Sequence, residues 1–177
     1  MRGNVGGLCM YRWCVVTTML VGICAAFAAQ VKDDGDAIVG IWLTKEGKAR
    51  VEITRQGDIY QGTIVWLREP NYPEGDTEAG KVKHDRNNPD EALRDRPIVG
   101  LRILDEFKYV GDRTWSGGYV YDPESGNTYR GKIRLDDNGR LLLRGYVGIS
   151  LLGRTEVWEP CPSEMQQQDE TKEGKTK

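Results

Sequence analysis

The feature that most constrains this chain is a strict alternation of apolar and polar residues within short segments. In Thr128–Leu135, the residues Tyr129, Gly131, Ile133 and Leu135 share one face, and polar or charged residues share the other. A period of two places apolar side chains on one side of a β-strand, whereas an amphipathic helix has a period of about 3.6. The alternation therefore predicts strands that each cover a core with one face.

Turn residues separate these segments at short intervals. Asp136–Gly139 ends in Asn-Gly, which tolerates positive φ, and Asp122–Gly126 contains Pro123, which fixes φ; both are typical of hairpins. Eight strands are predicted, over residues 38–43, 48–55, 58–67, 98–104, 117–122, 127–135, 140–147 and 153–159. Sequential hairpins favour an all-β fold, an eight-stranded antiparallel up-and-down barrel, because closure removes the free edges of the sheet.

One long connection, residues 68–97, interrupts the succession of hairpins. It contains Asn88, Pro89 and Glu91 in an order typical of a helix start, with Asn88 as the capping residue. Connections of this length are commonly functional or mobile. We expect a short helix here, in a segment that is a candidate lid over one mouth of the barrel.

The first 29 residues have the three parts of a secretory signal. Arg2 and Arg12 give a weakly basic start, residues 15–27 are uncharged and mostly apolar, and Ala26–Ala28 fits the small-residue cleavage pattern. The apolar stretch is shorter than the roughly 20 residues of a membrane-spanning helix. The sequence therefore predicts a signal peptide over residues 1–29 and a periplasmic or secreted protein without stable membrane insertion.

Cleavage near Ala28 or Ala29 would remove three of the four cysteines and leave Cys161. A lone cysteine forms no internal disulfide, so the fold must be stabilised by its core. A retained membrane anchor and a lipid on Cys24 are the alternatives, but Ile23 stands where a lipoprotein signal has a small residue.

The rest of the chain divides into three parts. Residues 30–36 form a polar linker, residues 37–159 form one barrel domain, and residues 160–177 form a charged tail that we expect to be disordered. Lysine and arginine total 25 against 27 acidic residues, and the two signs are interspersed. No basic stripe is present, so we expect no nucleic-acid partner. The sequence does not identify a protein partner, although the charged tail is a candidate contact segment.

Catalytic and metal-binding patterns are missing from the sequence. Gly148–Leu152 lacks the second glycine of a nucleophile elbow, and no glycine-rich phosphate loop leads from a strand into a helix. His84 and Asp85 are adjacent in the long connection, where we expect them to be solvated rather than paired for acid–base chemistry. We therefore predict no enzyme activity, no catalytic residues, no cofactor and no metal site.

Aromatic residues in the predicted strands are the better candidates for function. Either they fill a solid core or some of them line a pocket for a small ligand. An arginine that points inward would favour an acidic head group, whereas most arginines are exposed. The predicted ligand-binding residues are Tyr60, Trp66, Tyr121, Tyr129 and Arg144.

Several short motifs resemble those of one family. They are Gly40-Ile41-Trp42, Ile64–Leu67, Asn88–Asp90, Arg96–Leu101, Trp115–Gly118, Tyr121–Pro123, Arg144–Gly148, Gly153–Thr155 and Trp158. Their order and spacing are similar to those of the exported bacterial family called domain of unknown function 2147, over about residues 37–159. The resemblance implies a lipocalin-like barrel of unassigned biochemical role.

The resemblance also implies a structural role for three residues. Lipocalins carry a Gly-x-Trp on the first strand, and a late arginine packs across that tryptophan. Gly40, Trp42 and Arg154 are similar, and a cation–π contact between Trp42 and Arg154 would contribute about 0.5–2 kcal/mol.

Three functions compete on these grounds. The first is a barrel that binds or carries a small apolar or amphipathic ligand in the cell envelope. The alternative is a non-catalytic envelope interaction or structural protein whose barrel is filled by side chains. A small enzyme is the third, and it would need Glu52 or Glu156 inside the barrel with a raised pKa.

Overall fold

The computed structural model describes residues 34–148, 153–162 and 165. The predicted signal peptide lies outside the described residues, and so does most of the predicted tail. Within the described part of the chain, no helix is both long and apolar enough to cross a membrane.

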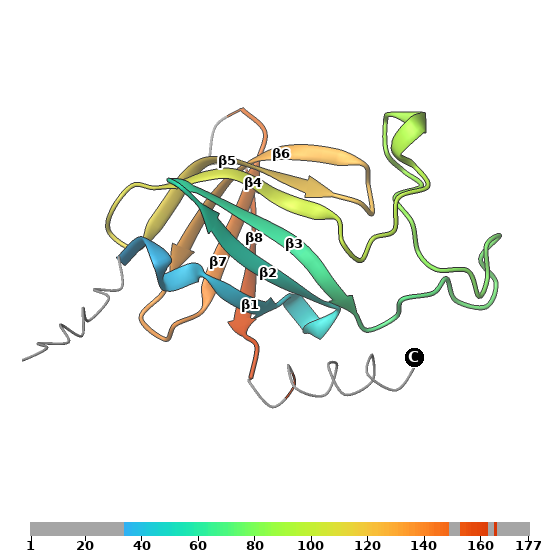
Figure 1. The fold of residues 1–177 in the computed structure, drawn as a ribbon, viewed down its shortest axis with the longest axis horizontal. Helices are drawn as coiled ribbons and strands as arrows, with labels where there is room; N and C mark the ends of the chain where they lie inside the picture. The colour runs from blue at the N-terminus through green and yellow to red at the C-terminus, as the bar shows by residue number, and fades with distance from the viewer. Residues whose placement is uncertain (1–33, 149–152, 163–164, 166–177) are drawn as a thin grey trace, which may run out of the picture. The chain divides into compact units, whose positions relative to one another are not determined.

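The eight strands form a closed barrel in which each strand pairs with its neighbour in sequence and the last pairs with the first (Figure 1). All pairs are antiparallel, so the predicted all-β up-and-down barrel is confirmed. The strands are β1 Gly40–Leu43, β2 Ala49–Gln56, β3 Ile59–Leu67, β4 Arg102–Tyr109, β5 Thr114–Asp122, β6 Asn127–Leu135, β7 Leu141–Tyr146 and β8 Gly153–Pro160.

The fourth strand differs most from its predicted range. It was expected over residues 98–104, but β4 begins at Arg102 and continues to Tyr109. Glu106 has a φ of 59°, in the left-handed region, and this irregularity breaks the alternation of inner and outer side chains. The strand therefore lacks the period-two pattern that marks the others.

A short 3-10 helix, η1 (Asp34–Ile38), closes one end of the barrel. Ile38 is fully buried, and two indole N–H groups donate to carbonyl oxygens of this helix: Trp42 to Ile38 at 2.7 Å and Trp115 to Gly35 at 3.1 Å. The packed helix thus begins at Asp34, within the segment that was predicted as a linker over residues 30–36. We call this end the closed end, and the end with the β5–β6 turn the open end.

Large side chains fill the closed half of the barrel. Tyr60 and Trp115 make an edge-to-face contact with ring centroids 6.1 Å apart, and both are buried. Phe107 lies against Gly118 and Gly131, where an added methyl group would overlap its ring. Glycines inside two strands therefore make room for one aromatic ring, which leaves this half of the interior densely packed.

The connection between β3 and β4 contains two isolated bridges and the 3-10 helix η3 (Glu91–Leu93). Its capping residue is Asp90, whose carboxylate accepts from the backbone N–H of Ala92, and not Asn88 as predicted. A second 3-10 helix, η2 (Lys45–Gly47), follows β1. Asn87 in the connection donates to the Glu124 carbonyl at 2.8 Å, so the connection contacts the β5–β6 turn at the open end.

Candidate functional site

The pairing of β7 with β8 shows which residues of β8 lie on the inner face of the barrel toward the open end. Trp158 is opposite Leu141, Glu156 opposite Leu143 and Arg154 opposite Gly145. These three residues of β8 alternate along the face that carries the buried core of β7. Their exposure rises toward the open end. Trp158 as a whole residue is 2% exposed, whereas the side chain of Glu156 is 37% exposed and that of Arg154 is 78% exposed. Among the described residues of β8, the inner face therefore becomes accessible to solvent toward the open end.

Two of the predicted ligand-binding residues point inward, but at different levels. Tyr60 is 2% exposed, and it belongs to the packed closed half, where its hydroxyl donates to Asp36 at 3.3 Å. Tyr129 is half-buried, pairs with Val120 and lies next to Gly145 in the open half. Of the predicted set, Tyr129 alone contributes to the solvent-reached inner face.

Trp66, one of the predicted ligand-binding residues, lies on the outer face, opposite to that of Tyr60 and Ile64. A register shift between Arg50 and Val51 places Arg50 opposite Trp66, while Val51 remains opposite Ile64. The Arg50 guanidinium lies 4.4 Å from the centroid of the Trp66 ring and donates to the Met165 carbonyl at 2.9 Å. A bulge of this kind exchanges the faces of all residues beyond it.

Tyr121 and Arg144 also lie outside the barrel wall. Tyr121 follows the inward-facing Val120, and its hydroxyl donates to Asp85 at 2.6 Å. Arg144 pairs with Thr155, donates to its hydroxyl at 2.9 Å and follows the buried Leu143. Neither residue can line the interior, because a step of one residue along a strand reverses the face. Both residues therefore lie on the outer face rather than on the inner face.

The structure does not bring Trp42 and Arg154 together. Trp42 is opposite Pro160 at the end of β8, whereas Arg154 is at its start, opposite Gly145. Arg154 forms a loose ion pair with Glu156 at 3.9 Å. The expected structural contact is therefore absent, and Arg154, not the predicted ligand-binding residue Arg144, lies on the inner face. Glu52, one of two carboxylates that an enzyme would need inside the barrel, is exposed.

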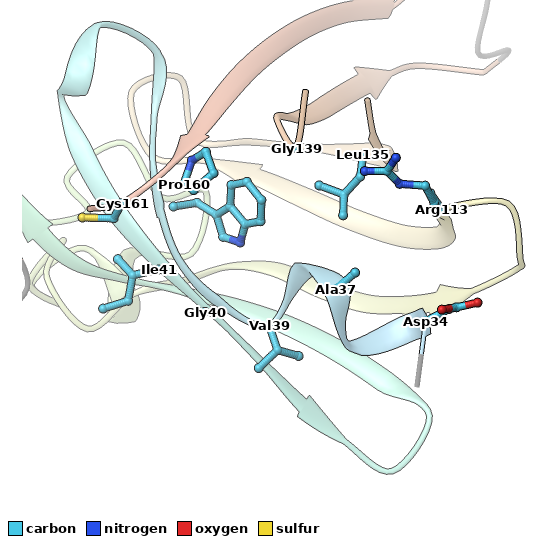
Figure 2. Close-up of a pocket in the computed structure, with 11 residues that line it drawn as sticks. Asp34, Ala37, Val39, Gly40, Ile41, Arg113, Leu135, Gly139, Pro160 and Cys161 are labelled. Atoms are coloured by element: carbon cyan, nitrogen blue, oxygen red, sulfur yellow. The ribbon is translucent and has the colours of Figure 1, made fainter. Parts of the chain in front are cut away.

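A hollow lies near the closed end, where β1 and β8 separate (Figure 2). We call it the side pocket; its volume is about 640 Å³. Its lining is Asp34, Ala37, Val39, Gly40, Ile41, Trp42, Arg113, Leu135, Gly139, Pro160 and Cys161. Asp34 and Arg113 lie toward one end of the view and Cys161 toward the other. No motif in the sequence indicated Arg113, whose φ of 51° is in the left-handed region.

The long connection contains a buried carboxylate, that of Asp85, which we expected to be solvated. Asp85 is fully buried and accepts from Tyr121 at 2.6 Å, Asn88 at 2.7 Å and Arg96 at 3.0 Å. Burial and the Asp85 carboxylate raise the pKa of Tyr121 to about 12. The phenol therefore stays protonated and donates, and Asp85 links the connection to β5.

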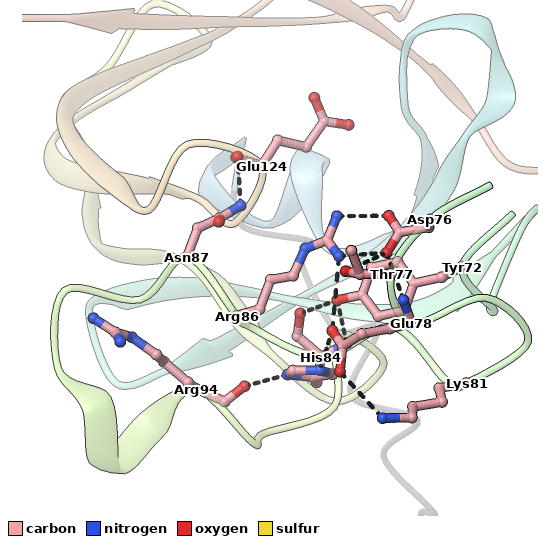
Figure 3. Close-up of polar contacts among 10 residues, drawn as sticks. All are labelled: Tyr72, Asp76, Thr77, Glu78, Lys81, His84, Arg86, Asn87, Arg94 and Glu124. Carbon is pink, nitrogen blue, oxygen red and sulfur yellow. Dashed lines mark hydrogen bonds and ion pairs between the residues drawn. The ribbon is translucent and has the colours of Figure 1, made fainter.

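His84 is at the centre of a polar network within the same connection (Figure 3). Its ring nitrogens contact the Arg94 carbonyl at 2.6 Å and the Glu78 carboxylate at 2.9 Å. The Arg94 carbonyl and, against the effect of burial, Glu78 raise the pKa of His84. Two acceptors on one imidazole favour the doubly protonated form.

Arg86 and Asp76 form the other part of this network. The guanidinium donates to both carboxylate oxygens, at 2.8 and 2.9 Å, and stacks 4.2 Å from the centroid of the Tyr72 ring. These hydrogen bonds lower the pKa of Asp76 to about 2. The network therefore fixes the loop conformation with partners that are all supplied by the connection itself.

Among the described residues, no group of three or more His, Cys, Asp or Glu side chains has the arrangement of a metal site. The functional candidates are thus the open-end inner face and the side pocket. The first carries an arginine and a carboxylate above a packed floor. The second is lined mainly by apolar side chains.

A closed up-and-down barrel of eight antiparallel strands, with a 3-10 helix at one end, defines a lipocalin-like protein. The chain matches the family described as "uncharacterized protein conserved in bacteria", domain of unknown function 2147, over residues 40–160, and it belongs to that family. This match confirms the resemblance found in the sequence.

A solved structure supports the same class. Protein HP1028 from Helicobacter pylori, described as belonging to the lipocalin family, is 25% identical and superimposes with a TM-score of 0.61. The similarity covers 73% of this chain and 86% of that protein. No curated protein matches the chain.

Proposed function

We propose that this protein is an exported carrier that binds a small amphipathic molecule with an acidic head group at the open end of its barrel. The observation that carries the proposal is the inward position of Arg154 on the solvent-reached part of the inner face. A lipocalin-like barrel with a solvent-reached inner face is suited to one small ligand. The predicted signal peptide supports export.

The apolar part of the ligand would contact Val120 and Tyr129, which are paired and half-buried. Its depth is limited, because Phe107 and Trp158 are buried side chains that occupy the interior below. The ligand would therefore lie near the mouth, with its head group still in contact with water. The negative charge of Glu156 repels an acidic head group, so the net attraction that Arg154 provides is modest.

The proposal is tested by titrating the purified protein with dodecanoate and dodecan-1-ol and comparing Arg154→Gln with Arg144→Gln. The two arginines are on adjacent strands, but Arg154 faces inward and Arg144 outward. We expect Arg154→Gln to weaken dodecanoate binding about two- to fivefold, the range for an exposed ion pair, and to leave dodecan-1-ol unaffected.

The Arg144→Gln variant should bind both probes like the wild type. Glu156→Gln should strengthen dodecanoate binding, because it removes the opposing charge. No binding of either probe to the wild-type protein would contradict the carrier function. An equal effect of both arginine substitutions would contradict the head-group position.

The packed closed half favours a second function, that of a non-catalytic envelope interaction or structural protein. Tyr60, Phe107 and Trp115 are at most 2% exposed and occupy space that a deep ligand cavity would need. In that case the outer surface would bind a protein partner, and the barrel would serve as a rigid support. Retention of a captured envelope partner by a protein that binds neither probe would favour this alternative.

A further inference from the structure

We infer that the side pocket is a second binding site, separate from the open end, and that it takes a small uncharged apolar molecule such as a medium-chain alcohol. The inference does not depend on the proposed function, because the pocket is near the closed end and its lining does not include Val120, Tyr129, Arg154 or Glu156.

The pocket exists because the wall between β1 and β8 is short. Trp42 pairs with Pro160 and Leu43 with Glu159. The backbone N–H of Cys161 then donates to the Ile41 carbonyl at 2.9 Å. Proline has no backbone N–H to extend the pairing. Beyond this point the start of β1 faces the β6–β7 turn across a gap, and the pocket occupies that gap (Figure 2).

The lining favours an apolar ligand. Ala37, Val39, Ile41, Leu135 and Pro160 provide aliphatic surface. The lining also includes a tryptophan whose indole N–H is already bonded to a carbonyl oxygen, so its ring offers apolar surface rather than a free donor. The volume of about 640 Å³ is in the range of roughly 300–1,000 Å³ that is usual for small-molecule sites.

The charges at the rim exclude a preference for an ion. Asp34 and Arg113 both line the pocket, and they carry opposite charges. Arg113 is already bonded to the Asp136 carbonyl at 2.7 Å and lies 3.6 Å from Asp137. An anionic head group would therefore compete with these acceptors and would also meet the Asp34 carboxylate in the same lining. A single hydroxyl group would suit this polar end.

The test uses octan-1-ol and octanoate as matched probes with isotopically labelled protein and nuclear magnetic resonance. Octan-1-ol should shift the signals of the Trp42 indole N–H and of the Val39 and Ile41 methyl groups. Octanoate should bind at least fivefold more weakly, as measured by titrating the shifts of the same signals. The methyl signals of Val120 report the open end in the same spectra.

Two substitutions extend the test. Ala37 is exposed and lines the pocket, so Ala37→Trp should fill it and abolish the Trp42 shifts. Val39→Asp should weaken octan-1-ol binding at least tenfold by placing a charge in the apolar lining. Val82→Asp changes another exposed valine, in the long connection, and should bind like the wild type. Circular dichroism verifies that each variant is folded.

Several results would overturn the inference. Shifts at Val120 alone would assign octan-1-ol to the open end and leave the proposed function intact. Equal binding of octanoate at the side pocket would refute the uncharged class. Nuclear Overhauser contacts between Ile41 and residues that precede Asp34 in the wild-type protein would show that the chain itself occupies the pocket. Absence of any shift would also overturn it.

Discussion

At the scale of single residues, two glycines that face each other have different functions in packing. Gly131 and Gly145 are directly paired on β6 and β7. A methyl group at Gly131 would overlap the ring of Phe107, whereas at Gly145 its nearest neighbour would be Tyr129 at 3.6 Å, an ordinary contact. Only Gly131 is needed to accommodate the core aromatic ring.

We therefore expect Gly131→Ala to lower the free energy of unfolding by about 1–3 kcal/mol, the usual cost of overpacking a dense core. Gly145→Ala should change it by less than about 0.5 kcal/mol, in the range of substitutions that create no clash. Urea denaturation followed by tryptophan fluorescence measures both. Equal losses would contradict the assignment of Phe107 to the space beside Gly131.

At the scale of elements, the long connection is held to the barrel by a buried polar contact in addition to Ile98 and Leu101, which belong to the hydrophobic core. Asp85 accepts hydrogen bonds from Asn88 and Arg96 of the connection and from Tyr121 of β5. Its removal would leave buried donors without their acceptor, which is costly away from water.

Asp85→Ala should lower the free energy of unfolding by about 1–3 kcal/mol. Asp95→Ala removes an exposed carboxylate from the same segment and is the matched control. Denaturant titration measures the loss, and amide hydrogen exchange of residues 84–97 should accelerate in the Asp85 variant. A protein with unchanged exchange in this segment would show that Asp85 does not fasten the connection.

The same connection should respond to pH through His84. Its pKa is raised in the folded protein, first by the Arg94 carbonyl and then by Glu78. The protonated form is thus favoured by folding, so this contribution to stability is complete below the unfolded pKa of about 6.5 and is lost as pH rises through the higher folded value.

The chain contains one histidine, so a histidine titration in this pH range can be assigned to His84. The stability of the wild-type connection, followed by hydrogen exchange between pH 5.5 and 8.5, should fall across this window, and the His84→Gln variant should show a flatter profile. Stability that rises with pH in the wild type, or an identical profile in the variant, would exclude His84 as the titrating group.

At the scale of the whole molecule, strand order and barrel closure could be predicted from local sequence, because alternation and hairpin turns are local properties. The face of individual residues could not. A register shift at Arg50 places Trp66 on the outer face, and Arg154, not Arg144, lies on the inner face. The burial of Asp85 depends on Tyr121, a partner 36 residues away, and no local pattern reports such a distance.

The helix at the closed end was missed for a related reason. Residues Asp34–Ile38 have the polar composition of a linker, and their stability comes from indole donors at Trp42 and Trp115. Side pockets are equally hard to foresee, since the gap depends on where β1 and β8 separate in space. Sequence thus predicts the wall of the barrel better than its two ends.

The short seam between β1 and β8 has a consequence for synthesis. The pairs Trp42–Pro160 and Leu43–Glu159 join the two extremes of the barrel sequence. A ribosome must therefore complete almost the entire domain before the cylinder can shut, and a chain terminated ahead of Glu159 keeps two unpaired margins. Such margins recruit other polypeptides, so premature termination of this protein should yield aggregates rather than a shortened but working barrel.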